Sequence, residues 1–244
     1  MAYSTNIDTA LTITSAVNVY LEKFRIHTQN IANAETAGYK SLLIRTSHQH
    51  KHHGNVLKKI AIDNSFRKGT FIKTGDPLNV MAGGNAFFAV KSDRNGTIYT
   101  SDGRFSIDNE NRLISINGDP VLDMDGNEIL IPTEAKGIHI RSTGEIMNSD
   151  NAIIARLGVF EFENLNNLTH IGTSAFKPNN ETAVAVTFPN LRDGGYEASN
   201  VNTVYEMASV QDIGLQIKRL ATNQRLSDSL LKEQTPEKLV KTWA

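Results

Sequence analysis

The sequence predicts an α+β protein whose N- and C-terminal helices form a coiled-coil pair, with a central, mainly antiparallel β module between them in the chain. Two observations predict this fold. Both ends of the 244-residue chain carry apolar residues at helical spacing. The stretch from about Ala61 to Asn190 has no long helical period and shows a turn signal roughly every eight residues.

The N-terminal helix is expected within residues 1–40, from about Asp8 to Ala34. Its apolar positions, completed by two threonines, alternate in steps of three and four, which is typical of a narrow coiled-coil stripe. They are Leu11, Thr14, Val17, Leu21, Phe24, Thr28 and Ile31. Gly38 is a natural stop for this helix, because glycine accepts the left-handed backbone conformation without strain.

The C-terminal helix is expected within residues 197–235 and ends before Pro236, leaving a tail at 236–244. Ser199 and Asn200 offer side-chain caps to its first turn. Its stripe contains Val204, Met207, Val210, Ile213, Gly214, Ile217, Leu220 and Ala221. From this pattern alone, each helix could also pack on the core of the domain itself.

The β module is expected at residues 61–196, as ten or more short antiparallel strands joined by Asn, Asp and Gly turns. Asn95-Gly96 lies between the strand-like stretches "FFAVKS" and "TIYTS". Because both residues accept a positive φ, this pair predicts a hairpin with a type I′ turn.

Residues 41–60 are expected to be a linker, and they contain a histidine tract. His48, His50, His52 and His53 are weak candidates for metal ligands, because imidazoles at alternate positions of an extended chain share one face. The sequence shows no neighbouring residue that would orient their imidazole rings. A solvated loop is therefore the simpler interpretation.

The composition excludes several classes of function. The 25 Lys and Arg residues nearly balance the 26 Asp and Glu residues, and aromatic residues do not interleave with a basic patch, so the sequence predicts no nucleic-acid binding. No apolar run approaches the ~18 residues that a membrane span needs. The chain has no cysteine, so disulfides and thiolate sites are excluded. The first residues lack a secretory signal pattern, which by itself indicates a cytoplasmic protein.

The sequence contains no recognisable catalytic constellation. There is no phosphate-binding glycine motif, no G-x-S-x-G and no H-E-x-x-H. The acidic residues lie mostly in turns, where they serve local hydrogen bonds. We therefore expect a protein that is not an enzyme and that has no cofactor.

Three stretches of the chain, in order, resemble the signatures of one family. "NIANAETAGYKS" (30–41) resembles the N-terminal signature of flagellar basal-body rod and hook proteins, which reads close to N-I-A-N-x-x-T-x-G-Y-K. "EASNVNTVYEM" (197–207) resembles their C-terminal S-N-V-x-x-x-x-E-M. Residues 74–132 are similar to their central segment, with "GDPL", "FFAV", "YTSDGRF" and "GDPVL" in order. The chain is thereby identified as a member of this family, most like the proximal-rod (F-type) protein.

The resemblance implies a structural subunit of the bacterial flagellar rod. Such subunits polymerise helically with copies of themselves and with other rod proteins, and they transmit torque to the hook. The flagellar type III export apparatus exports them unfolded and without a cleaved signal peptide, to the rod in the periplasm. This implication replaces the cytoplasmic location, and it includes no membrane insertion.

The resemblance also suggests which residues carry assembly. The terminal helices of the family pair with each other and across subunits, so the stripe residues are the expected assembly interface: Leu11, Val17, Leu21, Phe24, Ile31, Val204, Met207, Val210, Ile217 and Leu220. The signature residues are the expected junction between the helices and the β module: Asn30, Asn33, Gly38, Tyr39, Ser199, Asn200 and Val201.

Alternatives remain open at this point. The distal-rod (G-type) protein is the nearest, and a metal-binding β protein using the histidine tract is an alternative of another class. A peptidoglycan-cutting enzyme would need a carboxylate site that the sequence does not reveal. The C-terminal helix also departs from the family, since "GLQIKRL" stands where a Gln-Arg-Ala-Tyr/Phe block is common.

Overall fold

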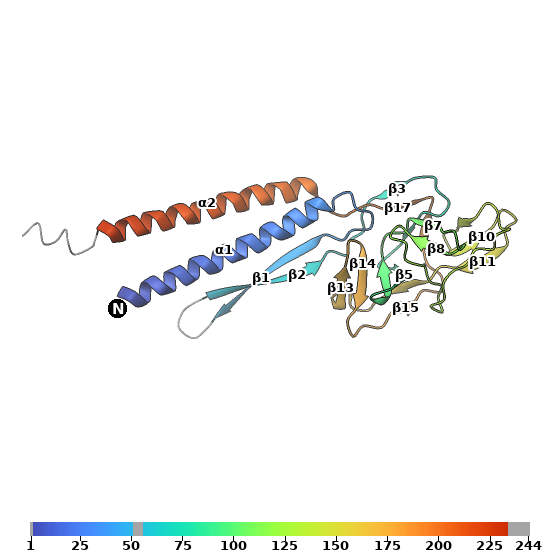
Figure 1. Cartoon of the computed structure of the whole chain (residues 1–244), viewed down its shortest axis with the longest axis horizontal. Helices are drawn as coiled ribbons and strands as arrows, with labels where there is room; N and C mark the ends of the chain where they lie inside the picture. The colour runs from blue at the N-terminus through green and yellow to red at the C-terminus, as the bar shows by residue number, and fades with distance from the viewer. Residues whose placement is uncertain (1, 51–55, 234–244) are drawn as a thin grey trace, which may run out of the picture. The chain divides into compact units, whose positions relative to one another are not determined.

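The computed structural model describes residues 2–50 and 56–233. The chain divides into two compact units. Unit 1 contains residues 1–31, 43–62 and 203–244, and unit 2 contains residues 32–42 and 63–202. The helices and a pair of long strands belong to unit 1, and the β module belongs to unit 2 (Figure 1).

Unit 1 is built from α1 (Ala2–Ala32), α2 (Thr203–Glu233) and a two-stranded sheet of β1 (Leu42–His50) and β2 (Val56–Asn64). The two helices lie side by side (Figure 1). α2 begins and ends close to its predicted bounds, and α1 ends close to its predicted end, but α1 begins at Ala2, before the expected start at about Asp8. Where the sequence analysis expected a histidine-rich linker at 41–60, the structure has these strands. Their β-branched residues, such as Ile44 and Ile62, favour strands. The linker prediction was based on the histidines and not on these residues.

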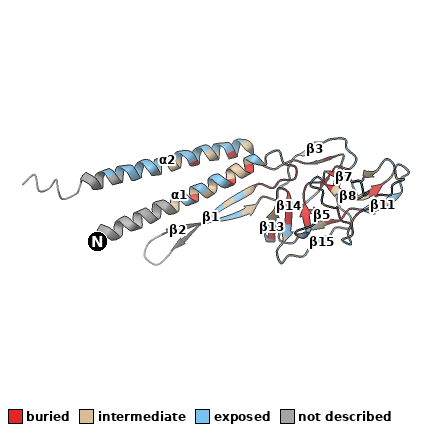
Figure 2. Cartoon of the chain, in the orientation of Figure 1, coloured by how far each residue is buried: buried red, intermediate tan, exposed pale blue. Residues whose placement is uncertain are grey.

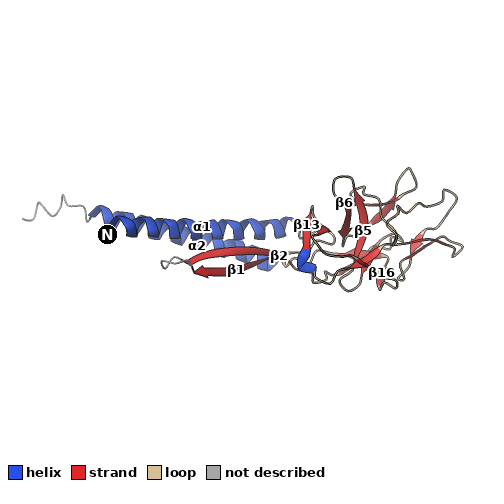
Figure 3. Cartoon of the chain, turned by 90° about the horizontal axis from the view of Figure 1, so that it is seen from below, coloured by secondary structure: helices blue, strands red, loops and turns tan. Residues whose placement is uncertain are grey.

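Unit 2 is made mainly of short strands (Figure 3). Its largest sheet has six strands in the order β13-β14-β6-β5-β12-β15, each antiparallel to its neighbour. These strands are β5 (Phe87–Ser92), β6 (Gly96–Thr100), β12 (Val159–Glu161), β13 (Leu168–Ile171), β14 (Ala175–Pro178) and β15 (Val184–Ala185). A short 3-10 helix, η1 (Leu165–Asn167), precedes β13.

Smaller sheets complete unit 2. A three-stranded sheet has the order β11-β10-β9, and the pairs β16-β4, β17-β3 and β7-β8 each form a two-stranded sheet. The bounds are β3 (Phe71–Lys73), β4 (Val80–Ala82), β7 (Phe105–Ile107), β8 (Leu113–Ser115), β9 (His139–Ile140), β10 (Glu145–Met147), β11 (Ile153–Arg156), β16 (Leu191–Asp193) and β17 (Gly195–Glu197). All the described pairings in these sheets are antiparallel, so the predicted α+β class and antiparallel module are confirmed.

The hairpin predicted at Asn95-Gly96 is present, but its turn differs from the prediction. Ser92 of β5 pairs with Gly96 of β6, so residues 93–95 form a three-residue loop. Gly96 has φ +69°, whereas Asn95 is not among the residues with positive φ. A type I′ turn needs positive φ at both central residues. The type I′ prediction was therefore wrong, because Gly96 belongs to the strand end.

The strand β5 is buried on both of its faces. Successive side chains of a strand point to opposite sides, and those of β5 contribute to two separate clusters. Phe88 and Val90 lie in a large aliphatic cluster with Leu113 and Ile146, whereas Phe87 lies in an aromatic cluster. The members of the aromatic cluster are Phe87, Ala89, Tyr99, Leu122, Phe162, Leu168 and Phe176. Buried residues accordingly concentrate in the strands of unit 2 (Figure 2).

Replacing Phe88 by alanine should destabilise unit 2 by about 3–5 kcal/mol, because the substitution removes a ring from a fully buried site and leaves a cavity. Phe188 is the matched control, since 84% of it is exposed. Phe188→Ala should change the free energy of unfolding by no more than about 0.5 kcal/mol. Urea unfolding followed by circular dichroism measures both. Equal losses for the two variants would contradict the core assignment.

Candidate functional site

The two helices of unit 1 contact each other through few side chains. Among the helical residues whose burial the structure describes, the buried apolar ones are Val19, Ile26 and Ile213. His27 near the end of α1 contacts Glu206 near the start of α2, whereas Tyr20, earlier in α1, lines a groove with Ile213. Earlier residues of α1 therefore meet later residues of α2, and the helices are antiparallel.

A polar cluster joins the helices where α1 ends and α2 begins. The Glu206 carboxylate accepts a hydrogen bond from the Asn30 amide at 3.0 Å, and its other oxygen lies 2.5 Å from Nδ1 of His27. Asn30 is 0% exposed and Glu206 is 5% exposed. The His27 ring also meets Tyr205 edge to face, with centroids 6.2 Å apart. We call His27, Asn30 and Glu206 the polar clamp.

A groove between α1 and α2 extends away from the polar clamp. It encloses about 380 Å³ and is open to solvent. Its lining residues are Tyr20, Lys23, His27, Tyr205, Ala208, Ser209, Asp212 and Ile213. This lining mixes aromatic rings with charges of both signs, so it does not resemble an enclosed cofactor site.

The apolar stripe predicted on α1 lies away from the residues of α1 that are buried. A helix turns about 100° per residue, which places Val17, Leu21, Phe24 and Ile31 on the far side of α1 from Val19, Ile26 and Asn30. Leu21 is 52% exposed and Phe24 is 41% exposed, and Val17 and Ile31 are half-buried. We call these four residues the outer stripe. The side chain of Leu11 lies outside the described residues.

The stripe predicted on α2 divides between two environments. Val210, Ile217 and Leu220 are half-buried, on the side of the helix that carries Glu206 and Ile213. Val204 and Met207 are exposed, by 80% and 51%. The structure therefore brings the first three toward α1 and leaves the other two uncovered. Assembly through these residues stays a prediction.

Within unit 2, the stretch after α1 lies against the stretch before α2. The backbone N–H of Gly38 donates to the carbonyl of Glu197, and the N–H of Asn200 donates to the carbonyl of Tyr39. Gly38 has φ +67°, and a Cβ there would lie 2.6 Å from the backbone nitrogen of Asp102. Glycine is therefore required here both by its conformation and by the close approach of another backbone segment.

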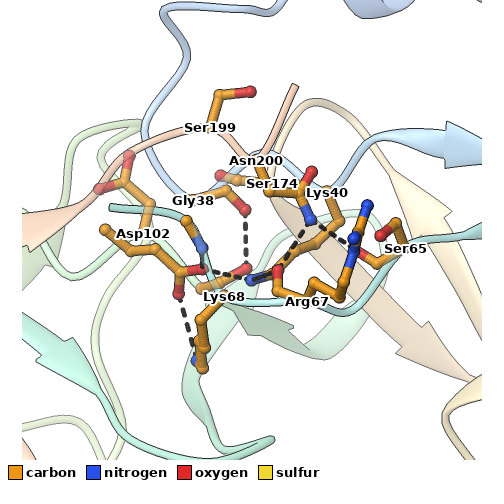
Figure 4. A network of polar contacts seen from close by, with 12 residues as sticks. Gly38, Lys40, Ser65, Arg67, Lys68, Asp102, Ser174, Ser199 and Asn200 are labelled. Atoms are coloured by element: carbon orange, nitrogen blue, oxygen red, sulfur yellow. Dashed lines mark hydrogen bonds and ion pairs between the residues drawn. The ribbon is translucent and has the colours of Figure 1, made fainter. Parts of the chain in front are cut away.

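The side chain of Asn200 joins two other backbone segments of unit 2, at Ser41 and at residues 65–67 (Figure 4). Its Oδ1 accepts from the N–H of Ser41 at 2.7 Å, and its amide group donates to the carbonyls of Ser65 and Arg67, both at 2.7 Å. An asparagine satisfies these three groups at once because its amide both donates and accepts. The sequence analysis expected Asn200 only as a cap and junction residue.

A buried ion pair lies beside Asn200 (Figure 4). Lys40 donates to Glu197 at 2.5 Å, and both side chains are 1% exposed. Glu197 also accepts from the N–H of Gly69 at 2.7 Å and from Lys68 at 3.1 Å. Burial lowers the pKa of Lys40 from the ordinary lysine value, and the Glu197 carboxylate opposes that shift by stabilising the charged form.

Tyr39 anchors the same stretch in an aromatic environment. Its ring is 1% exposed and meets the ring of His170 edge to face at 5.8 Å. His170 also packs against Phe176, and Nε2 of His170 lies 2.9 Å from the Thr173 carbonyl oxygen. Burial lowers the pKa of His170, and the bond to Thr173 opposes the shift.

The predicted junction residues are divided between the two units. Asn30 belongs to unit 1, and the remaining six belong to unit 2: Asn33, Gly38, Tyr39, Ser199, Asn200 and Val201. Their role as a junction stays a prediction. Sequence reasoning missed Lys40, Glu197 and Glu206, although all three stand inside the quoted signatures. Lys40 stands in the first signature and Glu197 in the second, and their charges are opposite. That difference in sign could have suggested the pair.

The histidine tract remains untested as a metal site. His48 and His50 belong to β1, but their side chains are not among those that the structure describes, and His52 and His53 lie outside the described residues. In the described part of the chain, no helix combines the length and apolar character that crossing a bilayer requires.

Comparison with known proteins identifies the family. A family model described as the flagellar hook protein FlgE/F/G D1 domain matches residues 81–148, within unit 2. The flagellar basal-body rod protein FlgF of Caulobacter vibrioides is 31% identical over 195 residues, which cover 75% of this chain and 78% of that protein. The chain belongs to the flagellar basal-body rod protein family.

Other members of the rod family extend the match. FlgF of Buchnera aphidicola subsp. Baizongia pistaciae is 31% identical over 229 residues, covering 86% of this chain and 90% of that protein. FlgG of Bacillus subtilis is 31% identical over 149 residues, covering 56% of each chain. The resemblance stated from the motifs is confirmed, and the chain is a structural rod subunit of the flagellar basal body. These relatives are named as rod components and not as enzymes.

Replacing Glu197 by glutamine should destabilise unit 2 by about 3–5 kcal/mol, because it leaves the buried Lys40 charge without its counter-ion. Glu110 is the matched control, since its side chain pairs with Arg112 but is 72% exposed. Glu110→Gln should cost no more than about 1 kcal/mol. Urea unfolding of both variants tests the comparison, and a similar cost for both would show that the buried pair is not a major contributor.

The free energy of unfolding should fall as the pH falls through the ordinary histidine pKa of 6.5, and the fall should end below the lowered pKa of His170. In that window the unfolded chain binds a proton that the folded chain excludes, so acid favours unfolding. His170→Gln removes this group and should flatten the dependence. Urea titrations at pH 7.5, 6.5 and 5.5 measure it, and an unchanged slope in the variant would contradict the assignment.

Proposed function

We propose that this rod subunit is of the F type and that α1 and α2 are its polymerisation elements. Neighbouring subunits would join through these helices as a coiled-coil tube, with copies of the chain and other rod proteins as partners. Heterologous contacts that do not close on themselves generate a helical polymer. The distal-rod G type remains the alternative, because relatives of both names match the chain.

The observation that carries this proposal is the exposed apolar surface of the helices. Leu21 and Phe24 on α1 and Val204 and Met207 on α2 are each at least 41% exposed. Large apolar side chains grouped on a helix face favour association with another surface, because their burial removes apolar area from water. Unit 2, in contrast, buries two apolar clusters of its own.

The sparse burial in unit 1 also supports folding that is coupled to assembly. A long helix loses conformational entropy when it forms, and the few buried side chains between α1 and α2 repay little of it. Contacts with neighbouring subunits would supply the rest. A helix pair that is marginally stable in the free subunit, and that gains its full stability only in the polymer, limits premature assembly.

We extend the same proposal to the route and place of the subunit. A chain with weakly stabilised termini suits export in an unfolded state through the flagellar type III apparatus, without a cleaved signal peptide and into the periplasmic part of the rod. Its role there is mechanical, and it needs neither a catalytic site nor a cofactor. Torque would pass through many contacts, each of them weak.

Replacing Phe24 by aspartate should abolish rod assembly and swimming, because burying a carboxylate in an apolar interface carries a large desolvation cost. Met207→Asp should act in the same way on α2. Both should leave unit 2 folded, since neither residue belongs to its clusters. Soft-agar motility and electron microscopy of purified basal bodies measure the effect.

Asn18 provides the control for this experiment. It lies on α1, is exposed and is outside the outer stripe. Asn18→Asp therefore adds the same charge to the same helix at a different face, and it should preserve swimming. Normal swimming of the Phe24→Asp and Met207→Asp strains would contradict the interface. Loss of swimming in all three strains would mean that the helix tolerates no added charge.

A further inference from the structure

The polar clamp lies in a helix pair whose buried residues recur at heptad spacing. Val19 and Ile26 are one heptad apart on α1, and Glu206 and Ile213 are one heptad apart on α2. Sliding the helices by seven residues would bring Ile26 to the place that Val19 occupies along α2. Two β-branched side chains of similar shape can replace each other, so these two residues do not by themselves exclude the slip.

The polar clamp does not tolerate that slip. Moving α1 by one heptad along α2 would bring the Asn30 amide against Ile213, which has no hydrogen-bonding group. Glu206 would lose both Asn30 and His27 as partners. Since Asn30 and Glu206 are almost completely buried, each group left without its partner would cost the free energy of its desolvation.

We propose that His27, Asn30 and Glu206 fix the register of α1 against α2 within each subunit. The apolar contacts supply attraction without a unique alignment, and the clamp selects one alignment. A buried polar residue in an apolar helix contact is known to specify register in this way in coiled coils. The proposal concerns one subunit and does not depend on the type of rod protein.

The register would determine the surface that a subunit offers to its neighbours. The outer stripe of α1 and the exposed Val204 and Met207 of α2 belong to different helices. A slip of seven residues, at a rise of about 1.5 Å each, would displace one set from the other by about 10 Å. Subunits with mixed registers could not share one helical lattice. This consequence, but not the register itself, rests on the proposed assembly function.

The absence of cysteine from the chain allows a direct measurement of the register by disulfide mapping. Lys23 and Ser209 line the same groove, so Lys23→Cys with Ser209→Cys reports the observed alignment. Gln216 is one heptad beyond Ser209, so Lys23→Cys with Gln216→Cys reports the slipped alignment. The purified full-length chain is oxidised, and the intramolecular disulfide is quantified on non-reducing gels.

In the otherwise native chain, the 23–209 disulfide should form at least about tenfold faster than the 23–216 disulfide. In the Asn30→Leu, Glu206→Leu variant the two rates should become similar, while the helix content by circular dichroism is retained. Retention is expected because leucine replaces both of the almost completely buried partners, so neither is left unpaired, and the His27 ring still has Tyr205 beside it. A clamp that contributed only stability would instead lower the helix content and leave the preference unchanged.

Two controls keep the result decisive. Asn18→Leu with Gln211→Leu makes a similar polar-to-leucine change at exposed positions of both helices and should keep the tenfold preference. Glu206→Gln preserves the acceptor for Asn30 and should also keep the preference. A preference for the 23–209 disulfide that survives in the leucine variant would overturn the proposal. Absence of this preference in the otherwise native chain would also overturn the proposal. Normal swimming of a leucine variant that has lost the preference would count against the assembly function and not against the register.

Discussion

The Glu197 carboxylate is the group on which the closure of unit 2 depends. The carboxylate accepts hydrogen bonds from Lys40, Lys68 and the backbone N–H of Gly69. The backbone carbonyl of Glu197 accepts from the N–H of Gly38. The segments that it joins are far apart in the chain. Because the carboxylate is almost completely buried, these partners must be in place whenever unit 2 is folded. The chain therefore enters and leaves the β module at one defined place.

The two units of the chain use apolar surface differently. Unit 2 places its aromatic and aliphatic residues in two clusters on either side of β5, and its stability is local to the subunit. Among the residues of unit 1 whose burial the structure describes, few side chains are buried, and large apolar ones are exposed on both helices. This division suits a rod protein, because a subunit that must join a polymer needs one part that is folded by itself and another part whose burial awaits neighbours.

Polar groups provide specificity where apolar contacts do not. In unit 2, Asn200 and Glu197 connect backbone segments that hydrophobic burial alone would not align. In unit 1, Asn30 and His27 of one helix both meet the almost completely buried carboxylate of Glu206 on the other. In both places a buried polar group is satisfied in one arrangement only, so alternative arrangements carry a desolvation cost.

The sequence by itself determined the class of the fold and the family. Helical spacing at both ends, turn residues in the middle and three ordered motifs were sufficient, because periodicity and turn chemistry are local properties. It did not determine which face of α1 is buried. The apolar residues at Leu21 and Phe24 formed the more regular pattern, yet the side chains of α1 that the structure describes as buried are Val19, Ile26 and Asn30. Only the tertiary structure decided this, and likewise that Lys40 meets Glu197, because the partner of a buried polar group is chosen by chain segments distant in sequence.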